Sequence, residues 1–156
     1  MRRSEREITD MREIINALDE CGAVRVAFQT GGAPYIVPLC FGYEYRDDRL
    51  RLFFHSAREG RKLDLLRANP AVGFEADHLL EITPGAEPCR WTARYVSVVG
   101  TGVASVVESK GEKKRAMDLI MRKYRCEGPL HYFDAALDST ALIALDVETI
   151  SGKRNL

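Results

Sequence analysis

The sequence lacks the features of secreted and membrane proteins. No apolar run in the 156 residues approaches the roughly 20 residues that a membrane helix needs. The charged start, residues 1–7, leads into no apolar segment, so we expect no signal peptide. Four cysteines lie far apart and form no C-x-x-C pair. We therefore expect a cytoplasmic protein with reduced thiols, with Cys21, Cys40 and Cys126 in the core and no prediction for Cys89.

The sequence also lacks net charge and the common catalytic motifs. Its 23 basic residues balance its 23 acidic ones, which argues against a nucleic-acid or membrane-surface partner. It contains no dinucleotide-binding glycine motif, Walker loop, nucleophile elbow or zinc-protease motif. His55, His78 and His131 share no ligand spacing, so we predict no metal site. The length predicts one domain, residues 1–156, with a substantial core.

What is present is a series of strand-like segments with helices set between them. Strands are expected at residues 24–30, 35–45, 50–55, 72–82, 95–107 and 141–150. Helices are expected from Asp10 to Cys21, from Ser56 to Asn69 and from Ser109 to Tyr124, with one helical turn near residues 133–137. Gly100 and Gly102 indicate a bend or bulge. Six strands in this arrangement predict an α+β, mainly β, barrel.

The junction at residues 53–63 carries the strongest chemical signal. Ser56 follows His55 at the expected strand end, and the adjacent cations Arg61 and Lys62 come early in the expected helix. Helix N-termini attract anions, whereas cations are normally found at helix C-termini. A phosphate bound here would explain the two cations. Alternatively, Ser56 caps the helix with Glu59, and the cations form a solvated face.

Two further segments are unusual but less specific. Pro38 interrupts an expected strand, so this strand is either a sheet edge or pairs with something else, such as a planar heterocycle. Residues 89–100 hold the only tryptophan, Trp91, together with arginines, a tyrosine and a serine at a strand entrance. Such residues anchor interfaces or form structural corners, and the sequence does not distinguish the two.

Taken in order, these segments resemble the superfamily of split barrels that bind flavin mononucleotide (FMN). This superfamily includes pyridoxamine-phosphate oxidase, and the branch that the chain resembles is that of the nitroimidazole-resistance (Nim-type) proteins. The resemblance extends over residues 3–153. The matching segments are Val37–Leu39, Phe41–Tyr43, Phe54–Ala57, Gly60–Lys62, Leu66–Pro70, Arg94–Gly100 and Ile150–Lys153. The resemblance implies a six-stranded antiparallel split β-barrel with flanking helices, and a homodimer with FMN at the subunit interface.

The resemblance also implies the site residues. The FMN phosphate would be held by His55, Ser56, Arg61 and Lys62, and the flavin ring would be lined by Val37, Pro38 and Leu39. Arg94, Tyr95 and Ser97 would approach from the same or the partner chain, with Arg94 near the pyrimidine end of the ring. A histidine at the position of His55 is characteristic of the Nim-like branch, so His55 is the expected catalytic residue. The alternative is that His55 only bonds the phosphate.

The implied activity is that of an FMN-dependent reductase. Electrons would pass from a donor such as a reduced nicotinamide to a small electron-poor acceptor such as a nitroaromatic. A flavin-binding sensor or reservoir without turnover is the alternative from another class. A barrel that binds haem or a deazaflavin is a third, with His55 as the one clear axial ligand. The basic C-terminal strand of the oxidases is reduced here to Lys153-Arg154, so vitamin B6 chemistry is not expected.

Overall fold

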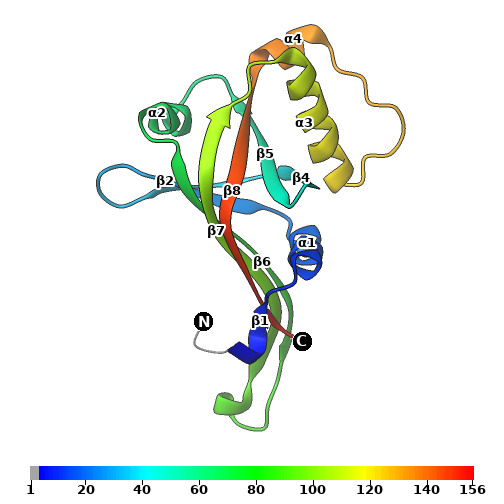
Figure 1. Cartoon of the computed structure of the whole chain (residues 1–156). Helices are drawn as coiled ribbons and strands as arrows, with labels where there is room; N and C mark the ends of the chain where they lie inside the picture. Colours follow the sequence, from blue (N-terminus) through cyan, green and yellow to red (C-terminus); the bar gives the residue numbers. More distant parts are fainter. Residues whose placement is uncertain (1–3) are drawn as a thin grey trace.

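The computed structural model describes residues 4–156, which form a mainly antiparallel β-sheet with four α-helices around it (Figure 1). Met1 to Arg3, part of the segment expected not to be a signal peptide, lie outside the described residues. The strands are β1 (Glu7–Ile8), β2 (Val24–Phe28), β3 (Tyr35–Leu39), β4 (Phe41–Arg46), β5 (Arg49–Ala57), β6 (Ala71–Thr83), β7 (Thr92–Val106) and β8 (Thr140–Asn155). The α-helices are α1 (Met11–Glu20), α2 (Arg61–Ala68), α3 (Lys110–Lys123) and α4 (Asp134–Ser139), and the 3-10 turns are η1 (Ser4–Arg6) and η2 (Pro88–Arg90).

The order of strands makes the sheet curl. Seven strands follow the order β3-β2-β6-β7-β8-β5-β4, and β1 pairs with β8. β3 and β4 therefore stand at opposite edges, yet a single residue, Cys40, joins them in sequence. The two edges must approach each other at Cys40, although no ladder joins β3 to β4 within residues 4–156. The result is consistent with a split barrel.

The expected number of six strands is wrong, because residues 4–156 contain eight. The expected strand 35–45 is two strands, since the chain changes partner at Cys40: β3 pairs with β2, whereas β4 pairs with β5. Pro38 lies in the edge strand β3, where a missing backbone N–H is tolerated. The additional strand β1 has two residues, too few for a sequence pattern to indicate.

The expected caps of α1 and α3 are confirmed. The Asp10 carboxylate accepts a hydrogen bond from the backbone N–H of Arg12 at 2.8 Å, and the Ser109 hydroxyl accepts one from that of Glu112 at 3.5 Å. The expected turn near residues 133–137 is α4. The expected bulge is also present, as a register shift between Thr101 and Gly102 where β7 pairs with β8.

The expected start of α2 at Ser56 is wrong. β5 continues through Ser56 and Ala57 because they pair with Ala141 and Thr140 of β8, and ladder hydrogen bonds keep this backbone extended. The helix begins at Arg61 instead, with Gly60 at the N-cap position.

The core lies on both sides of β5. Leu52 and Phe54 point into the curled sheet, whereas Phe53 points outward and is buried with residues of α3. The contact between α3 and β4 is close: a Cβ added at Gly42 would lie 2.5 Å from the backbone nitrogen of Ile120. Large buried side chains such as Phe53 contribute about 1.5–3 kcal/mol each. This packing fixes the end of the barrel where β5 leads into α2.

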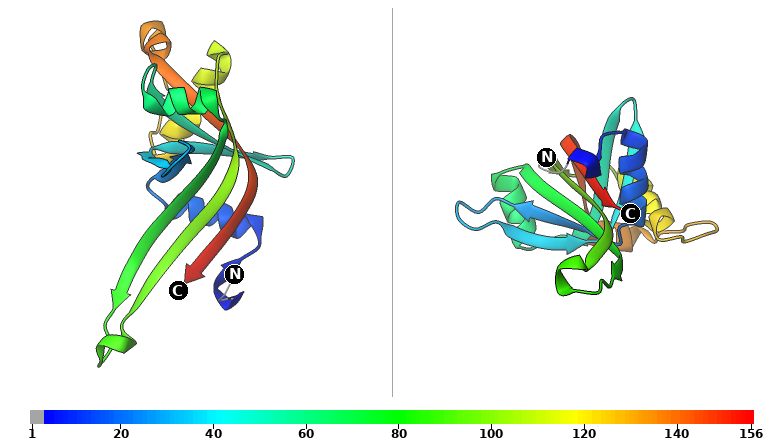
Figure 2. Two further views of the ribbon diagram at one scale, coloured as in Figure 1. Left: turned by 90° about the vertical axis from the view of Figure 1, so that its left-hand side faces the viewer. Right: turned by 90° about the horizontal axis from the view of Figure 1, so that it is seen from below.

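At the opposite end, β6 and β7 continue beyond the end of β8 as a two-stranded ribbon (Figures 1 and 2). We call residues 80–94 the arm. η2 is at its tip, and both views in Figure 2 show the arm projecting away from the other elements. Within residues 4–156, none of the helices is both long enough and apolar enough to span a membrane.

Candidate functional site

The N-terminus of α2 is built without a side-chain cap. Gly60 occupies the N-cap position with φ of 130°, a conformation that favours glycine, and no side chain among residues 4–156 caps the first N–H groups of the helix. Helix N-termini carry a partial positive charge and unpaired N–H groups. Arg61 and Lys62 add two full charges, and neither forms an ion pair with a carboxylate in the described part of the chain. This end of α2 is therefore suited to an anion.

Edge strand β3 lies beside this helix end. The Arg61 guanidinium carbon lies 4.8 Å from the centre of the Tyr35 ring, a cation–π contact that joins α2 to the start of β3. Val37 and Leu39 are half-buried against the core, and Pro38 is exposed. The structure therefore brings the expected ring-lining strand and the expected phosphate residues into one neighbourhood. The sequence analysis missed Tyr35, although an aromatic residue two positions before Val37 was a usable signal.

His55 lies at the barrel end of β5, opposite Leu142 of β8, and its side chain is exposed. The register of β4 with β5 pairs Phe41 with Phe54. One step further along that register brings Cys40 alongside His55, because residues in adjacent antiparallel strands lie opposite one another. The imidazole thus stands at the exposed end of the barrel, next to the end of β3.

Ser56 lies within β5 and not at the start of α2, where it was expected. Its side chain is almost fully buried, and its hydroxyl donates a hydrogen bond to the Ala57 carbonyl oxygen at 2.8 Å. It is not the cap of α2, so the capping alternative for this segment is wrong.

The expected site residues on β3, β5 and α2 form one group. Tyr95 and Ser97 lie in a second group, of polar residues at the base of the arm. Ser97 pairs with Lys153 of β8, and the Lys153 ammonium lies 5.7 Å from the Tyr95 ring centre. Partial burial raises the pKa of Tyr95, but hydrogen bonding to Lys153 and to Arg6 outweighs burial and leaves that pKa below its ordinary value. The sequence analysis did not place Lys153 and Arg6 in the site.

Arg94 lies on the arm, where its guanidinium binds the Glu81 carboxylate at 3.2 Å. An arginine already paired with a carboxylate is less available to a flavin ring than an unpaired one. Lys153, which forms no ion pair within residues 4–156, is the more available cation of this group.

His55 lies far along the sheet from Tyr95 and Ser97 in one chain. His55 lies opposite Leu142 of β8, whereas Val96, between Tyr95 and Ser97, lies opposite Arg154. Twelve residues of β8 separate these levels, which is about 40 Å at roughly 3.3 Å per residue in a strand. β3 lies nearer to the second group, because its registers through β2 and β6 place Val37 level with Gly100 of β7, three strands away.

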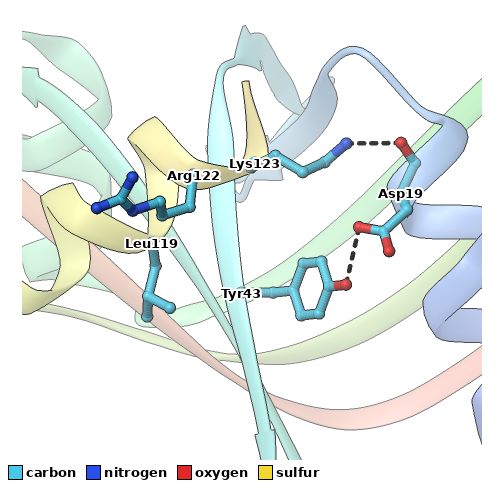
Figure 3. Close-up of a pocket in the computed structure, with 5 residues that line it drawn as sticks. All are labelled: Asp19, Tyr43, Leu119, Arg122 and Lys123. Carbon is cyan, nitrogen blue, oxygen red and sulfur yellow. Dashed lines mark hydrogen bonds between the residues drawn. The ribbon is translucent and has the colours of Figure 1, made fainter. Parts of the chain in front are cut away.

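A separate cavity of about 270 Å³ lies between α1, β4 and α3 and is lined by Asp19, Tyr43, Leu119, Arg122 and Lys123 (Figure 3). Its polar groups already have partners. The Lys123 ammonium donates to the carbonyl oxygens of Asp19 and Cys21 at 2.9 Å each, and the Tyr43 hydroxyl donates to the Asp19 carboxylate at 2.8 Å. These bonds satisfy carbonyls at the C-terminus of α1. We interpret the cavity as a structural contact between elements.

A family model described as pyridoxamine 5'-phosphate oxidase matches residues 10–154 of the chain. The chain belongs to this family. The match covers both groups of expected site residues. A comparison with curated proteins found no match.

Solved structures agree with the family assignment. A candidate 5-nitroimidazole antibiotic resistance protein from Bacteroides thetaiotaomicron is 29% identical, with a TM-score of 0.81 over 94% of this chain and 85% of that one. An FAD- and haem-binding protein from Mycobacterium smegmatis is 19% identical, with a TM-score of 0.79 over 96% and 73%. An FAD-binding protein from Mesorhizobium loti is 22% identical, with a TM-score of 0.67 over 97% and 98%. The latter two share the fold of this pyridoxamine 5'-phosphate oxidase family member.

Proposed function

We propose that this protein binds FMN and works in the cytoplasm as a reductase of small electron-poor acceptors of the nitroaromatic type. The observation that carries the proposal is the end of α2, where the helix N-terminus meets two cations, and where residues 4–156 supply neither a side-chain cap nor a carboxylate partner. A phosphate would satisfy the N–H groups and both charges, and each charge-assisted hydrogen bond contributes about 1.5–3 kcal/mol. Arg61 and Lys62 would hold the phosphate, and the backbone of Val37 to Leu39 would lie along the ring.

The similar structures support a flavin as the ligand. Two of them are described as FAD-binding proteins, one of which also binds haem. The resemblance to a candidate nitroimidazole-resistance protein supports the acceptor class. FMN is preferred here because the residues at α2 offer one compact anion site.

The distance between the two groups of site residues supports a homodimer with FMN at the subunit interface. Val37, Pro38, Leu39, His55, Arg61 and Lys62 would come from one subunit. Tyr95 and Ser97, together with Lys153, would come from its partner, because twelve residues of β8 separate the level of His55 from that of Val96 in one chain. In this arrangement Arg94 stays with Glu81 and is not a ring contact.

A bound flavin would supply the hydride and electron transfer chemistry. The residues of this chain would supply a proton-transferring side chain, a positive charge and an apolar cover for the ring. His55 presents an exposed imidazole beside the end of β3, where it can donate or accept a proton at a ring nitrogen. Lys153 would place a positive charge beside the bound ring. The half-buried Val37 and Leu39 would exclude water from one side of it.

An absorbance spectrum of the purified protein, with and without added FMN, tests the proposal first. We expect a yellow protein, or uptake of FMN with quenched flavin fluorescence. Steady-state oxidation of a reduced nicotinamide that depends on a nitroaromatic acceptor would then support the reductase. A single slow reduction would instead indicate a sensor or reservoir. A colourless protein that ignores FMN would overturn the proposal and lead to tests of haem and deazaflavin.

A further inference from the structure

The ladder between β2 and β3 ends abruptly. Its last pair is Val24 of β2 with Leu39 of β3. Two steps further in the same register, Gly22 would lie opposite Phe41, because partner positions in an antiparallel ladder move in opposite directions along the sequence. Within residues 4–156 this pair is not formed, since after Cys40 the chain pairs with β5 instead.

The hydroxyl of Tyr124, the residue that follows α3, stands between the two groups that do not pair. It accepts a hydrogen bond from the Phe41 backbone N–H at 3.2 Å and donates one to the Gly22 carbonyl oxygen at 2.8 Å. Burial raises the pKa of Tyr124 to about 12, so the hydroxyl keeps the proton that it donates. One side-chain oxygen therefore replaces the direct bond between the two backbones.

The preceding residue, Lys123, anchors this end of α3. Its ammonium donates to the carbonyl oxygens of Asp19 and Cys21 at 2.9 Å each, and the first of these bonds is drawn in Figure 3. The same ammonium lies 4.9 Å from the centre of the Phe41 ring. Lys123 and Tyr124 thus contact both the turn between α1 and β2 and the first residue of β4.

This contact lies at the end of the strand that is expected to line the flavin ring. Leu39 ends β3, Phe41 begins β4, and Cys40 alone joins them. The register of β4 with β5 brings Cys40 alongside His55. Within residues 4–156, β3 pairs only with β2, so one of its edges has no ladder to hold it. The position of this end of β3 therefore depends on what holds Phe41.

We propose that Tyr124 is a positioning residue of the flavin site: its hydroxyl sets the point at which β3 leaves β2, and so fixes the end of the ring-lining strand beside His55. Tyr124 acts through the Phe41 backbone and not by contact with the ring. A hydroxyl suits this role because it accepts a bond from an N–H group and donates one to a carbonyl at the same time. The flavin part of this inference rests on the proposed function.

Tyr124→Phe removes the hydroxyl and keeps the aromatic ring. In the full chain without flavin, we expect the Phe41 amide to exchange with deuterated water about 10-fold faster or more, as measured by NMR. The amide signal of Leu39 should shift as well. Tyr43→Phe is the matched control, because the Tyr43 hydroxyl also joins β4 to another element, α1, without reaching the Phe41 N–H. The same Phe41 exchange rate in both variants would overturn the inference.

The wild-type chain supplies a test that does not depend on a variant folding. With the Tyr124 bridge in place, the Phe41 amide should exchange as slowly as the amides bonded in the ladder of β2 with β3. Exchange at the rate of an unstructured chain would overturn the inference, whether or not Tyr124→Phe folds.

Two flavins separate the position of the ring from the binding of the phosphate. FMN and riboflavin share the ring system, and only FMN carries a phosphate. Tyr124→Phe should weaken the binding of both by about 3- to 10-fold in a fluorescence titration and leave the ratio of the two dissociation constants unchanged. Tyr43→Phe should bind both flavins as the wild type does.

A spectrum distinguishes positioning from a loss of stability. At saturating FMN, the visible circular dichroism of the bound flavin should differ between Tyr124→Phe and the wild type, because the surroundings of the ring have changed. A site that is only less stable would give the wild-type spectrum once saturated. Wild-type affinity together with wild-type dichroism in Tyr124→Phe would overturn the positioning role.

The inference and the proposed function fail separately. A wild-type chain that binds neither flavin would overturn the proposed function, while exchange of the Phe41 amide would still show whether Tyr124 sets the end of β3. A chain that binds FMN equally well with and without the Tyr124 hydroxyl would do the reverse.

Discussion

The two halves of β6 have the same extended backbone and opposite surroundings. In the first half, Val72, Phe74 and Ala76 are buried on the inner side of the sheet, and β2 and β7 pair with this half on either side. In the second half, from Asp77 to Thr83, every residue is exposed, and within residues 4–156 only β7 pairs with it. A strand is therefore stabilised by what lies on its faces, not by its ladder alone. The second half has no buried face within residues 4–156.

The sharpest test of this comparison is the stability of matched leucine variants. Leu52→Ala removes a fully buried side chain and should lower the free energy of unfolding by about 2–5 kcal/mol. Leu80→Ala on the arm should change it by less than about 0.5 kcal/mol when measured on the monomer. Urea unfolding at low protein concentration measures both. A loss for Leu80→Ala as large as that for Leu52→Ala would mean that the arm packs against its own chain.

The two regions also differ in how their cations are paired. Lys62→Ala should weaken FMN binding by about 1.5–3 kcal/mol, or about 10- to 150-fold in the dissociation constant. Arg90→Ala should leave FMN affinity unchanged, because Arg90 lies beside Glu87 at the tip of the arm. Fluorescence titration with FMN measures both variants. Unchanged FMN affinity in Lys62→Ala would refute its phosphate role.

The smallest expected effect compares a barrel thiol with an arm thiol. Burial raises the pKa of Cys21 from 9.0 to about 11, so the folded state favours the neutral thiol. Its contribution to stability is complete below about pH 9 and is lost as the pH rises toward 11. Cys21→Ala should therefore flatten the alkaline fall of the urea midpoint, whereas Cys89→Ala should not, since Cys89 is exposed on the arm. The same slope in both variants would contradict this assignment.

Local sequence signals predicted most of the elements. Asp10 and Ser109 specify helix starts through bonds to residues two or three positions away, and such contacts can be anticipated from the sequence. Pro38 likewise indicated a sheet edge as one of two alternatives, because proline has no backbone N–H to donate to a neighbouring strand.

Features that depend on distant pairing were missed. Ser56 has a good capping pattern, but pairing with Ala141, far away in sequence, keeps it in β5. The expectation that Cys40 and Cys126 lie in the core is wrong: Cys40 is exposed where the chain changes from pairing with β2 to pairing with β5, and Cys126 is only half-buried. The expected phosphate residues His55, Arg61 and Lys62 come from one short segment, and the contact of Arg61 with Tyr35 at the start of β3 depends on the fold. The sequence left open whether Tyr95 and Ser97 come from the same or the partner chain, since their separation from His55 is visible only once β8 is placed.

The position of β8 has a consequence for how the protein is made. β8 follows the seven other strands in the chain, yet it lies between β7 and β5 and also pairs with β1. During synthesis, the first seven strands cannot complete the sheet until β8 is made, because β8 fills the position between β7 and β5. Contacts so distant in sequence form late. A ribosome that stalls before residue 140 would release a chain with open strand edges and exposed core, a substrate for chaperones and proteases rather than a partly working protein.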